Sequence, residues 1–377
     1  MAAALLPQVR FFTFGEEEIF GAKGTRAFML VLGISALAIG LYAGIEMDFN
    51  ITPSKIILLT IIMGLGVIVV GQRVAFALVI AALMLANGGW YNVQQTMDGA
   101  RMRSYFGTYT VNSSENGRVR SLSHGTTMHG MQLMDEPTKP VSYYPSTSGV
   151  GIAMAKASEL YGPRASIGVV GLGTGTLACY RKPGQTWQFF EIDPLMVEIA
   201  RDRNIFSFLK RCAPNVAITL GDARLTLADV PNGTFDILAL DAFSSDSIPL
   251  HLLTKEAFAV YRRALKPDGL LLVHISNRYI DLNPVIAAEV KAGRWNAALR
   301  HDSPTENLAA KGSRASQWIA LSADPAKLAL LTGKVADKRG RYYDASQWIK
   351  LDPPGETRHW TDDYASVLPH LSFWKTL

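Results

Sequence analysis

The chain has little cysteine and no long run of basic residues, and each scarcity excludes a class of protein. Cys179 and Cys212 are its two cysteines, and their spacing is not that of metal ligands. Two thiols in 377 residues make no disulfide framework, so they favour a reducing compartment. The net charge is +5 and the basic residues are dispersed, which argues against nucleic-acid binding but suits a membrane surface.

Charge is also scarce in the N-terminal part of the chain. No charged residue occurs from Ala27 to Ile45, a run long enough for a helix to cross a bilayer. Two more apolar runs follow, with Gln72 and Arg73 at an expected tight turn between them. Residues 1–95 are therefore predicted to be a membrane region with about three transmembrane helices, at 27–45, 54–71 and 74–90. The alternative is a hydrophobic hairpin in the core of a soluble domain.

Residues 101–150 are expected to form a small β unit. Alternating apolar residues flank Asn116 and Gly117, which predicts a β-hairpin with an Asn-Gly turn. His124 and His129 lack the cysteine or carboxylate neighbours of a metal site, so no metal is predicted. They favour local hydrogen bonding or substrate contact. Tyr143 and Tyr144 are read either as packing residues or as substrate contacts.

Residues 151–377 alternate between strand-like and helix-like segments, which predicts an α/β fold with a mostly parallel, doubly wound sheet. The expected strands are 167–172, 187–191, 216–220, 235–240 and 270–275, and the expected helices are 174–180, 194–203, 223–228, 254–265 and 284–292. An antiparallel strand at 317–321 suits a methyltransferase-like sheet. Sheets of this kind bind ligands at the carboxyl ends of their strands.

Glycines and acids follow the expected strands at those ends. The first strand leads into Gly171, Gly173 and Gly175, which let the backbone approach a ligand closely. The next three strands lead into acids. Glu191 fits ribose hydroxyls, Asp222 fits the exocyclic amine of a base, and Asp241 fits the deprotonation of an amine nucleophile. Taken alone, the glycine run is equally compatible with a turn in an ordinary α/β protein.

In order and spacing, the motifs G-L-G-T-G-T, E-I-D-P, G-D-A and D-A-F-S-S-D-S-I-P resemble the spermidine synthase (polyamine aminopropyltransferase) family. With H-G-T-T-M-H-G-M-Q and W-T-D-D-Y-A-S-V-L-P-H-L, they look most like its bacterial membrane-fused branch. The resemblance covers about residues 101–377. It implies a small β unit before a methyltransferase-like Rossmann domain. It also implies transfer of an aminopropyl group from decarboxylated S-adenosylmethionine to an amine such as putrescine, with no metal and no tightly bound cofactor.

The resemblance implies roles for single residues as well. Asp241 would activate the attacking amine as the catalytic residue, and Asp246 would bind the far end of the diamine. Gln132 and one of Tyr143 or Tyr144 would line the substrate side. The donor would be held by Gly171, Gly173, Thr174, Gly175, Glu191, Asp222 and Ala223. Thr174 stands where the family has an aspartate that binds the donor's amine, and a hydroxyl cannot supply that countercharge.

This departure leaves two other functions open. One is an S-adenosylmethionine-dependent methyltransferase, and the other is a membrane-anchored nucleoside-binding module without turnover. The expected partners are a small-molecule amine and membrane lipid, without nucleic acid, and a homodimer is compatible with the sequence. The expected location is the bacterial inner membrane, as a multi-pass protein with its catalytic domain on the cytoplasmic side.

Overall fold

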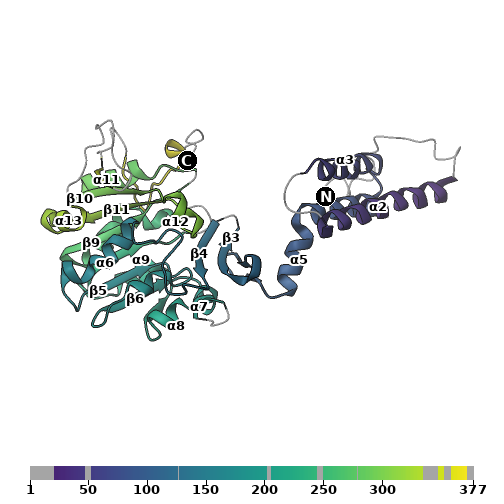
Figure 1. Ribbon diagram of the computed structural model, residues 1–377. Coiled ribbons are helices and arrows are strands. Elements are labelled where there is room, and N and C mark those ends of the chain that lie inside the picture. Colours follow the sequence, from purple (N-terminus) through teal and green to yellow (C-terminus); the bar gives the residue numbers. More distant parts are fainter. Residues whose placement is uncertain are drawn as a thin grey trace. The chain divides into compact units, whose positions relative to one another are not determined.

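The computed structural model describes residues 21–46, 52–125, 127–201, 205–243, 249–277, 279–333, 347–351 and 358–371. The chain divides into two compact units, Met1–Met102 and Arg103–Leu377, which are described separately (Figure 1). The expected small β unit therefore clusters with the large C-terminal unit rather than standing as a body of its own.

The first unit is helical. Its elements are α2 (Gly21–Glu46), α3 (Pro53–Ile68), α4 (Arg73–Met84), the π-helical turn η1 (Leu85–Gly89) and α5 (Trp90–Met97). Glycines bring α2 close to α4: a Cβ on Gly40 would lie 2.6 Å from the Cα of Ala82, and one on Gly33 would lie 2.8 Å from the Cα of Ala75. Close packing through small residues is typical of helices in lipid, where burial of apolar surface gives no driving force.

Two helices of the described residues are long and apolar enough to cross a membrane, Lys23–Glu46 and Arg73–Met97. The helix between them, α3, has 16 residues and is shorter than a usual span. The expectation of three transmembrane helices is therefore not supported, because the second apolar run forms a helix only from Pro53 to Ile68. The expected turn is confirmed: Gln72 is the N-cap residue of α4.

The second unit begins with a small sheet. β1 (Arg101–Arg103) precedes an antiparallel meander of β2 (Thr108–Ser113), β3 (Val119–His124) and β4 (Thr127–Leu133). Asn116 and Gly117 join β2 to β3 with φ values of 61° and 69°. Both lie in the left-handed region that Asn and Gly tolerate best, so the predicted Asn-Gly hairpin is confirmed.

The large sheet has eight strands in the order β12-β10-β11-β9-β8-β5-β6-β7. The strands from β7 to β9 pair in parallel, and β11 is antiparallel to both β9 and β10. The predicted α/β class with a reversed final strand is confirmed. The strand bounds are β5 (Ser166–Val170), β6 (Thr186–Glu191), β7 (Ala217–Leu220), β8 (Phe235–Leu240), β9 (Leu265–His274), β10 (Asn296–Asp302), β11 (Ser316–Ser322) and β12 (Trp348–Lys350).

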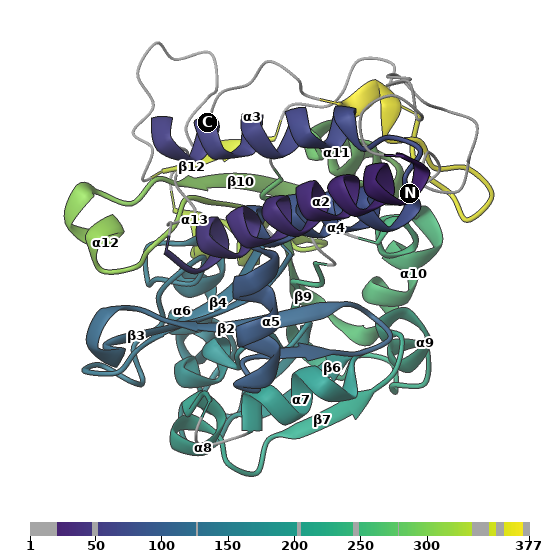
Figure 2. The ribbon, with the colours of Figure 1, turned by 90° about the vertical axis from the view of Figure 1, so that its right-hand side faces the viewer.

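Helices cover the sheet in two groups. α10 packs with α9 and α11, and α6 packs with α13. Figure 2 shows α9 and α10 to the right of the sheet and α6 and α13 to the left. The bounds are α6 (Gly149–Tyr161), η3 (Thr176–Tyr180), α7 (Pro194–Arg201), α8 (Phe208–Cys212), α9 (Ala223–Ala228), η4 (Leu250–Leu252), α10 (Lys255–Ala264), α11 (Asn283–Gly293), α12 (Glu306–Ala310), α13 (Pro325–Thr332) and η5 (Leu368–His370).

The core explains why the rim of the sheet is well fixed. All six residues of β8 are buried, as expected for a parallel strand covered on both faces. The helix expected at 174–180 is a 3-10 turn, η3, that begins only at Thr176. The glycine loop therefore occupies the residues before it, at the carboxyl end of β5.

Candidate active site

A cavity of about 540 Å³ lies at the carboxyl ends of the parallel strands. Of the residues predicted to hold the donor, Gly171, Gly173, Glu191, Asp222 and Ala223 line it. Of those predicted for chemistry and the acceptor, Tyr143, Tyr144 and Asp241 line it. Residues expected at the ends of four successive strands therefore meet in one space, as the parallel topology requires.

Gly171 lies where the chain leaves β5. Its φ is +91°, and a Cβ there would run into the backbone carbonyl of Asp241. The N–H of Asp241 donates to the carbonyl of Val170 at 2.8 Å, so the ends of β5 and β8 are held together. Only glycine permits this close approach, which keeps Asp241 next to the glycine loop.

Glu191 ends β6 and is held by the backbone. Its Oε2 accepts from the N–H of Leu172 at 2.9 Å, and its Oε1 accepts from the N–H of Asp193 at 3.0 Å. Burial raises the pKa of Glu191, and these backbone hydrogen bonds oppose that rise. The backbone of Ile192 also donates to this carboxylate, and the acceptor capacity that is left suits a ribose hydroxyl.

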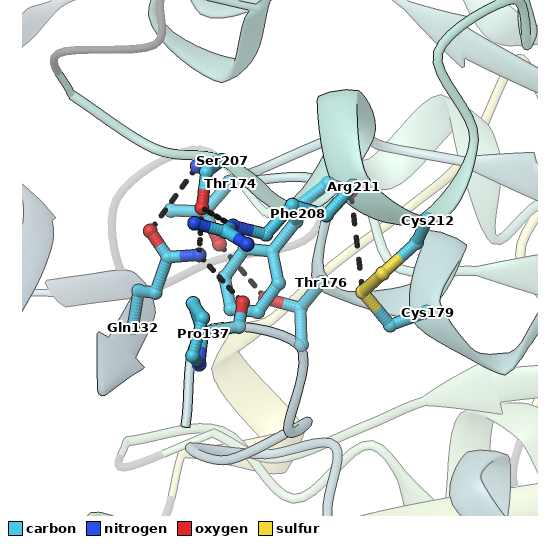
Figure 3. The surroundings of a disulfide bond; sticks show 9 residues. All are labelled: Gln132, Pro137, Thr174, Thr176, Cys179, Ser207, Phe208, Arg211 and Cys212. Carbon is cyan, nitrogen blue, oxygen red and sulfur yellow. Dashed lines mark hydrogen bonds between the residues drawn. A yellow bond between two sulfur atoms is a disulfide. The ribbon is translucent and has the colours of Figure 1, made fainter. Parts of the chain in front are cut away.

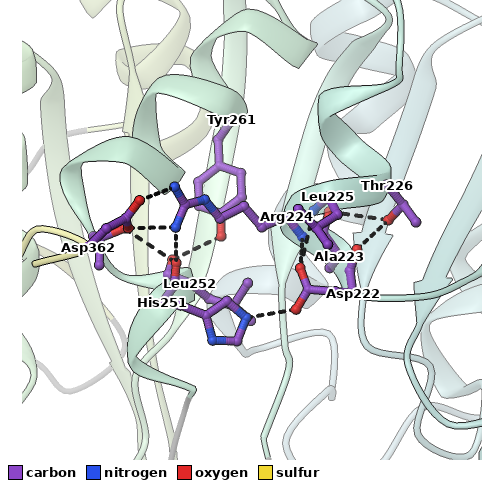
Figure 4. A network of polar contacts seen from close by, with 10 residues as sticks. Asp222, Ala223, Arg224, Leu225, Thr226, His251, Leu252, Tyr261 and Asp362 are labelled. Carbon is purple, nitrogen blue, oxygen red and sulfur yellow. Dashed lines mark hydrogen bonds and ion pairs between the residues drawn. The ribbon is translucent and has the colours of Figure 1, made fainter.

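Asp222 has both of its oxygens engaged (Figure 4). Its Oδ1 caps α9 by accepting from the N–H groups of Arg224 and Leu225, and its Oδ2 lies 2.8 Å from Nε2 of His251. An exocyclic amine would have to share Oδ2 with His251 or displace it. His251 itself lines the cavity, so it belongs to the same end of the site.

The turn from Thr361 to Tyr364, which contains Asp362, is joined to the Asp222 end of the cavity by an ion pair. Both terminal nitrogens of Arg224 donate to Asp362, and Thr254 donates to it at 2.9 Å. The hydrogen bond from Arg224 is the main reason that the pKa of Asp362 lies below its usual range. The segment that begins at Trp360 is thus fastened beside the cavity, close to where α9 starts.

Asp241 lies at the end of β8, surrounded by ring side chains. Tyr144 is buried, and its pKa is raised by that burial and then by the charge of, and a hydrogen bond to, Asp241. Oδ1 of Asp241 lies 2.6 Å from Nδ1 of His274. Both the tyrosine hydroxyl and the imidazole can donate to the carboxylate, so its orientation is set by two side chains.

Sequence reasoning missed His274 and Asp302. His274 is the last residue of β9 and Asp302 the last of β10, and both line the cavity. Burial raises the pKa of Asp302, and a hydrogen bond from Thr147 opposes the rise. The signal available was their position, because both end strands of the same sheet. His274 stood inside the expected strand 270–275.

The small sheet closes another side of the cavity. Tyr109, His124 and His129 line it, and the role of the two histidines in substrate contact stays a prediction. The hydroxyls of Tyr109 and Ser104 donate to Oδ2 of Asp193 at 2.8 Å and 2.5 Å. These bonds tie the small sheet to the segment after β6.

Three predicted site residues do not line the cavity. Gln132 is fully buried: its Nε2 donates to the carbonyl of Pro137 and to Oγ of Ser207, and its Oε1 accepts from the N–H of Ser207. Thr174 is 1% exposed and shares a hydrogen bond of 2.9 Å with Thr176. Gly175 is the third, and a Cβ there would meet Leu209 of α8. Figure 3 shows Gln132 and Thr174 beside α8, held by protein partners.

This placement corrects two expectations. Gln132 holds the chain around Ser207 instead of facing a substrate, because its amide is fully used within the protein. The side chain of Thr174 points at Gly130, whose missing Cβ leaves the space that it fills. Thr174 therefore does not face a donor directly. Asp246, the acid expected at the far end of the diamine, lies outside the described residues.

The two cysteines were expected to provide no disulfide framework and to favour a reducing compartment, but they form one disulfide. Cys179 of η3 and Cys212 of α8 are bonded, with their Cα atoms 4.8 Å apart (Figure 3). The sequence could not reveal the pairing, because 33 residues separate the two. The bond fastens α8 to the turn that follows the glycine loop.

Known proteins similar to this chain come from the family that its motifs resemble. No family model matches the chain. A polyamine aminopropyltransferase of Vibrio vulnificus (strain CMCP6) is 30% identical over 129 residues, which are 33% of this chain and 42% of the relative. The match thus spans less than half of the relative's length. A probable spermidine synthase from Corynebacterium glutamicum ATCC 13032 superposes with a TM-score of 0.50 at 16% identity, over 67% of this chain and 90% of that chain.

One third of the chain thus resembles a polyamine aminopropyltransferase in sequence, and its fold resembles that of a probable spermidine synthase. A spermidine synthase from Thermotoga maritima is also similar, at 15% identity and a TM-score of 0.42, over 62% of this chain and 78% of that one. The predicted family resemblance and the methyltransferase-like Rossmann fold are confirmed. The more specific likeness to a membrane-fused branch stays a prediction.

Proposed function

We propose that the chain transfers an aminopropyl group from decarboxylated S-adenosylmethionine to a small amine such as putrescine. The likeness to a polyamine aminopropyltransferase supports this class of reaction. The observation that carries the proposal is the position of Asp241, which lines one cavity together with Glu191 and Asp222. The acids that would hold the nucleoside and the acid that would accept the proton thus line the same cavity.

The donor would bind across the ends of β5 to β7. Glu191 would accept the ribose hydroxyls, and Asp222 would accept from the adenine amine after exchanging its contact with His251. Gly171 and Gly173 would let the backbone lie against the nucleoside. The sulfonium would then lie toward Asp241, beyond the glycine loop.

In the transfer step, the amine nitrogen attacks the propyl carbon that is bonded to the sulfonium sulfur. The new C–N bond forms as the C–S bond breaks, and the bonding electrons return to sulfur to leave neutral methylthioadenosine. Asp241 takes the proton that the amine loses. A positioned carboxylate of this kind typically contributes about a hundredfold or more to the rate.

The second candidate is methyl transfer from S-adenosylmethionine, and Arg314 favours it. Arg314 lines the cavity, where its guanidinium can pair with the carboxylate that this donor retains. The two reactions differ in donor and in product, which makes them separable by experiment.

Turnover with each donor tests the proposal. The full chain is incubated with putrescine and either donor, and methylthioadenosine and S-adenosylhomocysteine are measured. The proposal predicts methylthioadenosine from the decarboxylated donor alone. S-adenosylhomocysteine from the other donor would favour methyl transfer, and binding of donor with neither product over a panel of amines would favour a binding module. Glu191→Gln should weaken the binding of the preferred donor, whereas Glu198→Gln on the exposed face of α7 should not.

A further inference from the structure

We propose that His274 is a positioning residue that fixes the carboxylate of Asp241 through a directed chain of hydrogen bonds. The inference rests on the proposed function, since it concerns the carboxylate that would accept the proton. It concerns a histidine at the end of β9 that no motif indicated. The chain of bonds runs from the backbone of β11 to Asp241.

The direction of the hydrogen bonds is set at Asp241, because an ionised carboxylate only accepts and Nδ1 of His274 must then donate. The N–H of Gln317 donates to Oγ of Ser276 at 2.8 Å. The hydroxyl hydrogen of Ser276 is then free to donate to Nε2 of His274, 2.7 Å away. If Nε2 accepts, the proton of a neutral imidazole sits on Nδ1, and Nδ1 donates to Oδ1 of Asp241 at 2.6 Å.

Packing holds the imidazole in this orientation. His274 is 3% exposed, and its ring stacks on Trp318 with centroids 4.4 Å apart and an interplanar angle of 5°. Trp318 is its direct partner across the β9–β11 pair. Phe243 approaches the ring at 4.8 Å and Tyr143 at 5.6 Å. The ring therefore cannot flip without disturbing its neighbours on three elements.

The chain of hydrogen bonds positions the carboxylate of Asp241 and does not carry a proton away from it. It ends on a backbone N–H, which does not release its proton at neutral pH, so a proton taken by Asp241 must leave through the cavity. The hydrogen bond from His274 occupies Oδ1 of Asp241. The carboxylate of Asp241 is then held by His274 at Oδ1 and by the contact with Tyr144, which fixes how it meets the amine.

Two amide substitutions separate a donor at Nδ1 from mere filling of space. In His274→Asn the side-chain amide nitrogen takes the place of Nδ1, whereas in His274→Gln it takes the place of Nε2. We expect His274→Asn to keep most of kcat. We expect His274→Gln and His274→Ala to lose about a hundredfold in kcat, the cost of a misplaced catalytic group, with KM for the amine little changed. Equal loss in both amide variants, or loss confined to KM, would overturn the inference.

A second measurement does not depend on turnover. The full chain is labelled with ¹⁵N-histidine, and the His274 signals are assigned by their loss in His274→Asn. The chain of bonds predicts a neutral imidazole protonated at Nδ1, and Ser276→Ala should release this tautomer. Protonation at Nε2 in the wild type contradicts the inference even if the enzyme is active. Absence of methylthioadenosine with Nδ1 protonated would instead count against the proposed function alone.

Discussion

Asp222 and Asp241 follow successive strands of the chain, yet their carboxylates are committed in different ways. Asp222 spends one oxygen on the cap of α9 and the other on His251. Asp241 has one oxygen on His274 and a contact with Tyr144. Sequence pattern predicted both residues at the rim because acids after parallel strands share an edge. It could not predict their partners, since these come from β9 and from the segment before α10.

Outside the cavity, Glu289 is the residue with the clearest effect of pH. It is 2% exposed on α11, and its Oε1 has no hydrogen-bond partner among the described residues. Burial, and then the charge of Glu256, raises its pKa to about 7. The folded state therefore holds a proton on Glu289 more tightly than the unfolded chain does, and stability is lost as the pH rises from about 4.5 to 7.

We therefore expect Glu289→Gln to stabilise the protein at pH 8 by roughly 1–2 kcal/mol and to have little effect at pH 5. Denaturant unfolding at the two pH values measures this difference. Glu198→Gln on α7 is the matched control, because that side chain is exposed. An equal effect of Glu289→Gln at both pH values would show that the carboxyl does not titrate as described.

At the scale of elements, the join between β5 and β8 depends on Gly171. Gly171→Ala would add a Cβ against the carbonyl of Asp241 and strain a backbone at φ +91°. We expect this variant to lose donor affinity by at least about tenfold, because Asp241 and the glycine loop must move apart. Calorimetry with the decarboxylated donor measures the loss. Gly233→Ala is the control, since its φ is +67° but nothing lies within 4 Å of its Cβ; similar losses in both would contradict the argument.

The disulfide is the second element-scale feature with a testable consequence. It closes a loop of 33 residues, and the chain-entropy model gives a stabilisation of about 3–4 kcal/mol for such a loop. We expect Cys179→Ser with Cys212→Ser, or a reducing agent, to lower the free energy of unfolding by that amount. Thiol titration of the denatured wild type should find no free thiol. Two free thiols in protein purified without reductant would contradict the pairing.

The sequence predicted the positions of helices and strands better than the direction in which individual side chains point. β8 matches its expected bounds because an almost wholly apolar run, interrupted only by Asp236, lies between a turn and an acid. Thr174, Gly175 and Gln132 were placed in the site because they stand within or near its motifs. Whether a loop residue faces the cavity or α8 depends on packing by Leu209, Ser207 and Gly130, which lie far along the chain.

At the scale of the whole molecule, the N-terminal unit differs from the C-terminal unit in its surface. Many of its large apolar side chains are exposed, among them Val31, Ile57 and Met63, on helices that already pack against one another through small residues. Such a surface suits lipid. We expect the full chain to stay with membranes after a high-salt and carbonate wash and to need detergent for extraction. Release by the wash would show that the helices do not enter the bilayer.

The disulfide also concerns the compartment in which the whole molecule lies. Disulfides persist in oxidising compartments and are rare in the cytosol. The pairing of Cys179 with Cys212 therefore argues against the reducing compartment that the scarcity of cysteine had favoured. A donor made in the cytosol would require the C-terminal unit on the cytoplasmic side, whereas a stable disulfide favours an oxidising compartment. Thiol titration of protein whose thiols are trapped in intact cells shows whether the cysteines are reduced or bonded.

We propose that Asp241 activates an amine in the same cavity in which Glu191 and Asp222 hold the donor. The most direct measurement compares Asp241→Asn with the wild type in two assays, donor binding by calorimetry and methylthioadenosine formation with a saturating amine. Asparagine keeps the shape of the side chain and removes its proton acceptor. We expect Asp241→Asn to bind the donor within about twofold of the wild-type affinity and to react more slowly by about a hundredfold or more. A variant that binds the donor and forms product at the wild-type rate would contradict the proposal.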